Sequence, residues 1–250
     1  MISVCMATYN GERFIREQID SILPQLSTED ELIISDDGST DGTLGILAGY
    51  AAADARVKVL HHEKEISQSP YRNFRYATKN FENALRHASG DYIFLSDQDD
   101  VWLPEKVTVC MRLLEIYDCI VHNYRVIDVD GNLIEEAHFR TKPVHNQLFM
   151  NVVDNHFRGC CLALKAEILR YALPIPLNVI GHDYWIGCLA AHYGTVHYEM
   201  RPLIAYRRYS DSVSGKRKRN VYGRGGVLYA FSHRFMLLGN ILKRLWERKI

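Results

Sequence analysis

The sequence predicts an α/β fold in which a mainly parallel central sheet is flanked by helices. Up to residue 116, short apolar runs of strand length alternate with segments whose apolar residues recur every three or four positions. A polar turn leads from each run into the next helix, and this order is typical of parallel sheets. The length of 250 residues and the hydrophobic fraction of 47% suit one large domain, with or without an appendage.

The first half of the chain is expected to hold four strands and four helices. Asn10 is placed to cap the first helix, and Gly90 stands where it can end the third at its C′ position. Pro104 suits the first turn of the fourth helix. Residues 61–72 have no clear period and are expected to form a loop. The strands are expected at 2–7, 32–35, 57–60 and 92–95, and the helical faces at 15–22, 44–51, 74–88 and 104–114.

The second half has a weaker pattern. A hairpin is expected within 120–134, because Asp130-Gly131 is a favoured hairpin turn. Residues 135–155 are polar and irregular, and residues 210–226 are rich in Ser, Gly, Lys and Arg. Strands are expected within 159–164 and 195–206, and helices at 166–171, 184–192 and 227–250.

The formal net charge is zero, but the charges are unevenly placed. Residues 201–250 hold thirteen Lys or Arg and two acids, whereas the first 200 residues hold 17 basic and 28 acidic residues. A basic end of this kind favours contact with an anionic surface. No apolar run approaches the ~20 residues that span a bilayer, and the start of the chain lacks the pattern of a signal peptide. We therefore expect a cytoplasmic protein.

The cysteines show no Cys-x-x-Cys spacing and have apolar neighbours. In a cytosolic protein such residues are expected to be reduced thiols in the core. Their spacing also argues against a zinc site. The six positions are Cys5, Cys110, Cys119, Cys160, Cys161 and Cys188.

Polar clusters follow three of the expected strands, at residues 8–10, 36–37 and 97–99. The carboxyl ends of parallel strands meet at one edge of a sheet, and ligands of α/β proteins bind there. We therefore expect the three clusters to form one composite site.

The third cluster concentrates negative charge. Asp97, Asp99 and Asp100 lie within four positions, and their carboxylates would repel one another. A divalent cation removes this repulsion, and Mg²⁺ or Mn²⁺ often shares carboxylate oxygens with a substrate phosphate. The cluster therefore indicates a metal site for a phosphorylated ligand. A solvated acidic turn is the alternative.

Six short motifs carry a resemblance to a known family. The specific ones are SVCMATYNGE (3–12), ISDDGSTDGT (34–43) and GDYIFLSDQDDVW (90–102), and the weaker ones are NFENAL (80–85), GHDYW (181–185) and YRRY (206–209). On these motifs, the chain resembles the family-two glycosyltransferases over about residues 2–215. Its LSDQDDVW segment (95–102) is most similar to bacterial rhamnosyltransferase-like members that build surface polysaccharides.

The resemblance implies the GT-A fold, with a nucleotide-binding half at 1–116, an acceptor-binding half at 117–215 and a basic tail at 216–250. It implies an inverting enzyme that moves a sugar from a UDP- or TDP-sugar to a hydroxyl of a glycan acceptor. The acceptor glycan would belong to capsule, O-antigen or exopolysaccharide synthesis. Mn²⁺ or Mg²⁺ would be the cofactor.

The resemblance also implies roles for side chains around the nucleotide. Thr8 and Tyr9 would border the base, with Tyr9 stacked on it. Either Asp36 or Asp37 would hydrogen-bond the base imide. The other side chains expected at the nucleotide are Asn10, Glu12, Gln98, Arg72 and Arg75.

Three carboxylates would form the reaction centre. Asp97 would face the ribose or the metal, Asp99 would bind the metal directly, and Asp183 would be the catalytic base. The metal would stabilise charge on the leaving diphosphate, while the base would take the proton of the acceptor hydroxyl. As a purely structural alternative, Asp183 could cap the helix that follows it.

Other structural alternatives and one departure from the family remain open. Tyr9 could be an ordinary core residue, and Trp102 could be a packing residue. Many relatives carry a His after the Tyr-Arg pair, and this chain has Tyr206-Arg207-Arg208-Tyr209 instead, so a third protein ligand to the metal is in doubt. Arg207 or Arg208 could contact the diphosphate instead.

Two other functions compete with glycosyl transfer. A sugar nucleotidyltransferase shares a related architecture, but its basic Gly-rich loop is missing from residues 7–11. A non-catalytic member that binds a nucleotide in an assembly complex is the other alternative, and the retained carboxylates argue against it.

The C-terminal segment predicts a basic amphipathic helix. Its apolar residues step by three or four along 227–246, and Lys or Arg residues lie between them. This pattern favours an anionic membrane surface, at the inner face of the cytoplasmic membrane, and suits a lipid-linked acceptor. The alternative is a helix that packs on the catalytic domain or in a homodimer. No nucleic-acid role is expected, because base-stacking aromatics are not interleaved with the charges.

Overall fold

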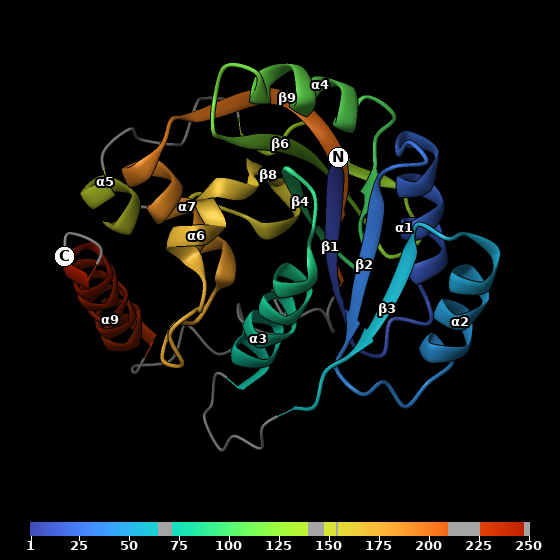
Figure 1. Cartoon of the computed structure of the whole chain (residues 1–250), viewed down its shortest axis with the longest axis horizontal. Helices are drawn as coiled ribbons and strands as arrows, with labels where there is room; N and C mark the ends of the chain where they lie inside the picture. Colours follow the sequence, from blue (N-terminus) through green and yellow to red (C-terminus); the bar gives the residue numbers. More distant parts are fainter. Residues whose placement is uncertain (65–71, 140–147, 154, 210–225, 248–250) are drawn as a thin grey trace.

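The computed structural model describes residues 1–64, 72–139, 148–153, 155–209 and 226–247. Within these residues one sheet holds nine strands, in the order β3-β2-β1-β4-β8-β6-β9-β5, with β7 paired to β6 (Figure 1). The strands are β1 (Ile2–Thr8), β2 (Glu31–Asp36), β3 (Val57–His61), β4 (Tyr92–Asp97), β5 (Val101–Trp102), β6 (Cys119–Ile127), β7 (Leu133–Glu135), β8 (Leu162–Lys165) and β9 (Val196–Arg207).

Helices cover both faces of the sheet. Those on one face are α1 (Ile15–Ile22), η1 (Leu23–Gln25), α2 (Thr43–Ala53) and α4 (Lys106–Leu114). Those on the other are α3 (Arg72–His87), η3 (Ala166–Ile168), α6 (Leu169–Ala172) and α7 (His182–Tyr193). Near α7 lie α5 (Leu148–Val153) and α9 (Gly226–Glu247), and η2 (Gly159–Cys161) precedes β8.

The central strands are apolar on both sides because both sides are buried. In β1, Val4 and Met6 join the core beneath α1 and α2, whereas Cys5 between them joins the core beneath α3 and α7. Successive side chains of a strand point to opposite faces, so a strand covered on both faces needs a continuous apolar run. The apolar runs in the sequence therefore predicted these strands correctly.

The sheet changes direction at β4. Strands β1, β2, β3 and β4 pair in parallel, as the alternation of strands and helices predicted. Beyond β4, strand β8 runs antiparallel to both β4 and β6, while β6 and β9 pair in parallel. The predicted hairpin is confirmed by the antiparallel pair of β6 and β7, with Gly131 at a φ of +87° in the turn.

Two predicted helix ends are wrong. Helix α1 begins at Ile15, and Phe14 rather than Asn10 is its N-cap. Helix α3 ends at His87, before Gly90. Gly90 is needed for packing instead, since a Cβ there would lie 2.7 Å from the backbone nitrogen of Ser3.

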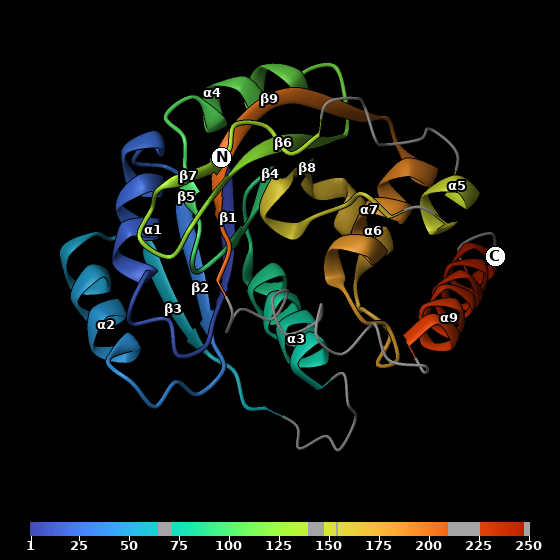
Figure 2. The same cartoon turned by 180° about the vertical axis from the view of Figure 1, so that it is seen from behind.

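The predicted C-terminal helix is present as α9. It lies at the opposite edge of the molecule from α2 in both views (Figures 1 and 2). Its inward side chains Leu237 and Ile241 are buried in the core of the α3 and α7 face. Arg244 donates to the carbonyl of Pro174 at 2.6 Å and lies over the ring of Trp185. One face of the helix therefore packs on the domain, and no helix among the described residues is long and apolar enough to cross a membrane.

The tight contact between α7 and the segment before η2 gives a stability prediction. A Cβ added at Gly187 would lie 2.2 Å from the Phe157 ring, and both residues are buried. Gly187→Ala should therefore destabilise the fold by about 1–3 kcal/mol, as overpacked cores do, despite the better helix propensity of alanine. Thermal unfolding followed by circular dichroism measures the change.

The matched control is Gly45→Ala in α2, where an added Cβ meets no atom within 4 Å. That change should leave the melting temperature unchanged or raise it, because alanine favours helix more than glycine does. Equal melting temperatures for the two variants would contradict the packing of α7 described above.

Candidate functional site

The first polar cluster lies at the carboxyl end of β1, where it is joined to the cluster after β4. The strand registers pair Thr8 with Asp36 and Ala7 with Asp97. The Thr8 hydroxyl donates to Oε1 of Gln98 at 2.6 Å, and the backbone N–H of Tyr9 donates to the same oxygen at 2.8 Å. The three clusters therefore meet at one sheet edge, as predicted.

Two predicted nucleotide neighbours connect the loops to each other. Oδ1 of Asn10 accepts a hydrogen bond from the backbone of Thr40 at 2.8 Å, and Oε2 of Glu12 accepts one from Gly42 at 2.9 Å. These bonds tie the loop after β1 to the loop after β2. Contact of Asn10 or Glu12 with a nucleotide stays a prediction.

The two carboxylates of the second cluster have different surroundings. Asp36 is fully buried, and both its oxygens accept hydrogen bonds from Ser39, at 2.8 Å and 2.5 Å. Oδ1 of Asp37 lies 2.6 Å from Nδ1 of His62, and its other oxygen lies 3.9 Å from Nζ of Lys64. Burial raises the pKa of Asp37, and the His62 hydrogen bond opposes that rise. Asp36 thus stabilises the turn after β2, while Asp37 contacts the side chains of His62 and Lys64.

Tyr9 lies beside Asp37 at the surface. Its side chain is 46% exposed, so the alternative that Tyr9 is a core residue is wrong. Nζ of Lys64 lies 2.8 Å from the centre of the Tyr9 ring. Lys64 therefore contacts both the exposed Tyr9 and the buried Asp37 at the carboxyl ends of β1 to β3. Sequence reasoning missed His62 and Lys64, because they follow β3 in a loop without a period.

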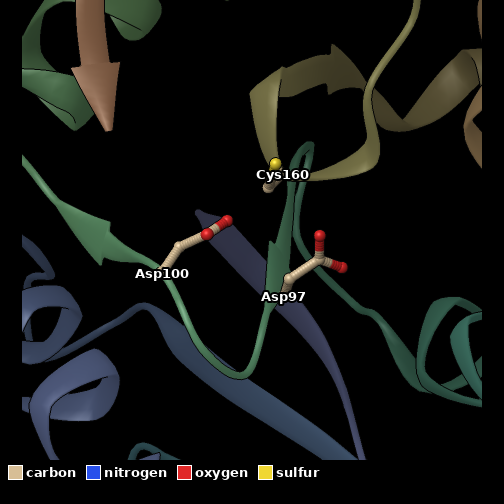
Figure 3. Close-up of side chains that lie close together, drawn as sticks. All are labelled: Asp97, Asp100 and Cys160. Carbon is tan, nitrogen blue, oxygen red and sulfur yellow. The ribbon is translucent and has the colours of Figure 1, made fainter. Parts of the chain in front are cut away.

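The acidic turn after β4 directs its carboxylates to different partners. Asp97 and Asp100 converge on Cys160, and the possible ligand atoms of these three residues all lie within 4.8 Å of one another (Figure 3). Oδ2 of Asp99 instead accepts a hydrogen bond from the Tyr209 hydroxyl at 2.7 Å. Sequence reasoning missed Cys160, which it placed in the core.

The acidic turn and Asp183 share one electrostatic neighbourhood. The pKa of Asp97 is raised to about 7, first by burial and then by the negative charges of Asp99 and Asp183. Oδ2 of Asp183 accepts a hydrogen bond at 3.3 Å from the backbone of Gly159, which is next to Cys160 in the chain. The three carboxylates that the sequence assigned to one reaction centre therefore lie close together.

Asp183 is not a helix cap. Gly181, with a φ of +97°, is the N-cap of α7, and Asp183 lies in the first turn of the helix. The positive end of the helix dipole favours a carboxylate in that turn. The alternative that explained Asp183 by capping alone is therefore wrong.

Arg207 is a residue whose expected role the structure corrects. It is 3% exposed, its Nε donates to the carbonyl of Asp99 at 3.0 Å, and its Nη2 donates to Glu17 at 2.6 Å. The guanidinium is thus committed to the protein and cannot also reach a diphosphate. Trp102 is 3% exposed, which confirms that it is a packing residue.

Two predicted arginines are less closely described. Arg72 opens α3, but its side chain lies outside the described residues. Arg75 is half-buried in the same helix. Contact of either residue with a nucleotide stays a prediction.

The donor set at the acidic turn fits a divalent cation. Oδ2 of Asp100 is buried and has no hydrogen-bond partner among the described residues. Carboxylate oxygens suit Mg²⁺ and Mn²⁺, and an unpaired buried carboxylate oxygen is costly without a positive partner. All six cysteines are buried and free, as expected.

The profile of Glycosyl transferase family 2 matches residues 3–171. The chain belongs to this family. It is 27% identical over 260 residues to the dTDP-rhamnosyl transferase RfbG of Shigella flexneri, across 98% of this chain and 81% of that one. It is also 29% identical over 188 residues to the glucosyltransferase WfgD of Escherichia coli, across 74% of this chain and 68% of that one. Family membership confirms the predicted glycosyltransferase.

Solved structures of glycosyltransferases confirm the GT-A fold. The structure of residues 1–349 of S. aureus TarS matches with a TM-score of 0.64 at 19% identity, over 98% of this chain and 72% of that one. A mannosyltransferase from Pyrobaculum calidifontis, in complex with GDP-Man and Mn²⁺, matches with a TM-score of 0.61 at 17% identity, over 97% of this chain and 68% of that one.

The raised pKa of Asp97 predicts how stability depends on pH in the absence of a metal. Its ordinary pKa is 3.8 and its folded value is about 7, so the protonated form is favoured in the folded state. The stabilisation of the folded state by protonated Asp97 is complete below pH 3.8 and is lost as the pH rises towards 7 and beyond. In a chelator, Asp97→Asn should melt several degrees above the parent protein at pH 8, and the gap should shrink at pH 5.

The exposed Glu29→Gln is the control, since it removes a charge far from the acidic turn. Its melting temperature should follow that of the parent protein at every pH. A gap for Asp97→Asn that does not change between pH 5 and pH 8 would show that Asp97 does not titrate as described.

Proposed function

We propose that the protein transfers a sugar from a UDP- or TDP-sugar to a hydroxyl of a glycan, with inversion at the anomeric carbon. The observation that carries the proposal is the geometry at the carboxyl ends of the parallel strands: Asp97 lies beside Cys160, the adjacent Gly159 donates to Asp183, and Asp99 lies in the same acidic turn as Asp97. A metal-assisted displacement needs a cation at the leaving diphosphate and a base near the acceptor. These three carboxylates supply both kinds of group.

The nucleotide base lies against Tyr9 in this proposal. The exposed ring of Tyr9 offers a stacking surface, and Thr8 lies at the adjacent strand end. Asp37 accepts the imide N–H of the base through Oδ2. Both oxygens of Asp36 already accept from Ser39, whereas in Asp37 Oδ1 is paired with His62 at 2.6 Å and Oδ2 lies 3.9 Å from Nζ of Lys64. A buried acceptor that is matched by a donor on the base gives selectivity for uracil or thymine over cytosine.

The diphosphate would lie at the acidic turn, where Asp97 and Asp99 would hold Mn²⁺ or Mg²⁺. The bound cation stabilises the negative charge that grows on the leaving diphosphate. The hydrogen bond from the Tyr209 hydroxyl orients the Asp99 carboxylate. The Mn²⁺-containing mannosyltransferase of the same fold supports a divalent metal.

Asp183 acts as the general base. The N–H of Gly159 donates to its Oδ2 at 3.3 Å and the N–H of Tyr184 donates to its Oδ1 at 2.8 Å, so both carboxylate oxygens are held in place and each keeps a lone pair for the acceptor. The carboxylate accepts the proton of the acceptor hydroxyl as this hydroxyl attacks the anomeric carbon from the side opposite the diphosphate. The sugar–oxygen bond to the diphosphate breaks as the new glycosidic bond forms, and the anomeric centre inverts.

The relatives support a role in bacterial surface polysaccharides. The name of RfbG describes a dTDP-rhamnosyl transferase, and that of WfgD describes transfer from UDP-Glc to GlcNAc-diphosphoundecaprenol. From these relatives we infer that the acceptor of this protein is a lipid-linked glycan in capsule, O-antigen or exopolysaccharide synthesis. The protein would then work in the cytoplasm, at the inner face of the cytoplasmic membrane.

Removal of the base tests the proposal. With Mn²⁺ and a panel of UDP- and TDP-sugars, Asp183→Asn should lower transfer about 10²- to 10⁴-fold, the range typical of general-base catalysis. The melting shift caused by UDP or TDP should be unchanged, because Asp183 does not hold the nucleotide. Released nucleotide, measured by a coupled assay, reports transfer.

Glu29→Gln should keep full activity in the same assay, as an exposed acid remote from the site. Full transfer by Asp183→Asn would remove Asp183 from the mechanism. Exchange that depends on pyrophosphate, in place of UDP or TDP release, would support the nucleotidyltransferase alternative.

Helix α9 also supports a membrane surface as a partner. Its outer side exposes Phe235, Leu242 and Trp246, each more than half exposed, beside the exposed Lys243. Three large apolar side chains with neighbouring positive charge suit the interface of an anionic bilayer. We therefore propose that α9 lays its outer side on the membrane that holds the acceptor.

Vesicle flotation tests this surface. The full chain should float with vesicles that contain phosphatidylglycerol and much less with neutral vesicles. Replacement of Phe235, Leu242 and Trp246 by serine should lower binding at least about tenfold, because less apolar surface is then removed from water on binding. Transfer to a soluble acceptor should be unchanged.

Two exposed apolar residues elsewhere provide the control. Ile116 and Leu177 are 70% and 60% exposed, and their double serine variant should bind vesicles like the parent protein. Equal flotation of the α9 variant would contradict the proposal. A homodimer that buries these α9 side chains in solution, seen by sedimentation, would contradict it as well.

A further inference from the structure

We propose that Cys160 is a ligand to the cation at the acidic turn, together with Asp97 and Asp100. The site would then bind cations that accept sulfur, such as Co²⁺ and Zn²⁺, more tightly than Mg²⁺. This inference rests on the proposed function and deepens it, because it adds Asp100 and Cys160 to the ligands of the same site and gives its metal preference.

The sheet itself brings Cys160 to the acidic turn. Strand β8 runs antiparallel to β4, with Tyr92 opposite Lys165 and Phe94 opposite Ala163. The 3-10 helix η2, which contains Cys160, comes directly before β8 and contacts β4. The thiol therefore lies at the carboxyl end of β4 because β8 begins where β4 ends (Figure 3).

The separation of the ligand atoms suits one shared ion. The carboxylate oxygens of Asp97 and Asp100 and the sulfur of Cys160 all lie within 4.8 Å of one another. Ligand oxygens lie about 2.0–2.2 Å from a Zn²⁺ ion and sulfurs about 2.3 Å, so two ligands of one ion lie up to about 4.5 Å apart. Small side-chain rotations are enough to close the site around a cation.

An unpaired oxygen points to a missing positive partner. Oδ1 of Asp100 accepts the backbone N–H of Arg207 at 3.0 Å, but its buried Oδ2 has no hydrogen-bond partner among the described residues. Asp100 is 1% exposed, so water does not replace that partner freely. Asp99 differs, because Tyr209 already occupies one of its oxygens. Asp100 therefore adds a free oxygen to the carboxylates of Asp97 and Asp99 proposed above.

The nearby basic side chains are committed to other groups. Arg207 donates to the carbonyl of Asp99 and to Glu17. Nζ of the buried Lys106 donates to the carbonyl of Cys160 at 2.8 Å and lies 4.0 Å from the Trp102 ring centre. These contacts fix the backbone on both sides of the cluster, while the carboxylates and the thiol face one another.

The backbone around Cys160 also connects the site to the base. Gly159 donates to Asp183, and η2 is closed by the bond from Cys161 N to the carbonyl of Arg158 at 3.0 Å. Movement of Cys160 would therefore move the group that holds Asp183. A cation on the thiolate would fix the distance between the metal and the base.

The mixed donor set determines which cations fit. Thiolates favour Zn²⁺ and other later transition metals, whereas Mg²⁺ takes oxygen ligands and keeps its waters. The thiol releases its proton to solvent when the cation binds, since the thiolate is the ligand. The vicinal Cys161 lies outside this group of three, so it supplies a matched control.

Cobalt absorption tests the thiolate ligand without any turnover. The full chain, stripped of metal by a chelator, should develop a near-ultraviolet thiolate-to-cobalt charge-transfer band when Co²⁺ is added. Cys160→Ser should lose this band and bind Co²⁺ at least about tenfold more weakly, while Cys161→Ser should keep both. Asp100→Asn should also weaken Co²⁺ binding, and Glu29→Gln should not.

Circular dichroism and the melting temperature establish that each variant is folded, and Cys160→Ala repeats the test with a smaller side chain. The inference is overturned if the parent protein shows no such band, or if the band survives in both Cys160 variants. Mn²⁺-dependent transfer without the band would sink the inference alone and leave the proposed function standing. The band in a protein that uses no nucleotide sugar would sink the proposed function and support the inference.

Discussion

The structure depends on holding several carboxylates together at the end of β4 against their mutual repulsion. The protein does this largely through backbone contacts. Arg207 donates from its side chain to the carbonyl of Asp99 and from its backbone to Asp100. The shape of the turn is thus fixed, and the carboxylate of Asp97 lies near the sulfur of Cys160. Arg207 ends β9, so these hydrogen bonds lie next to the antiparallel pairing of β9 with β5.

The change of direction in the sheet explains why the site is assembled at this point. A parallel neighbour would begin at the far end of β4, and its first residues would lie away from the acidic turn. The antiparallel β8 begins beside the end of β4 and brings η2 to it. Since Gly159 in η2 also holds Asp183, one short segment joins the acidic turn to α7. The proposed metal and base thus share one support.

The sequence allowed the parallel half and its three polar clusters to be predicted, because periodicity and turn chemistry are local signals. It could not show that Asp36 and Asp37 have different surroundings, since Ser39 bonds both oxygens of Asp36 while Asp37 pairs with His62 from a later loop. Nor could it place Cys160 beside Asp97, because antiparallel pairing across more than sixty residues leaves no local pattern. Nor could it show that Arg207 bonds to the protein itself, because its partners lie on three distant segments.

Helix α9 shows how a correct helix prediction can still misjudge charge. The sequence counts Arg244 among the positive charges of the tail, yet the structure places it inward, on the carbonyls of α6 and the residues that follow. It therefore anchors the helix and adds nothing to an outward basic face. In the proposed membrane contact, the exposed apolar area of Phe235, Leu242 and Trp246 would therefore contribute alongside the remaining positive charge.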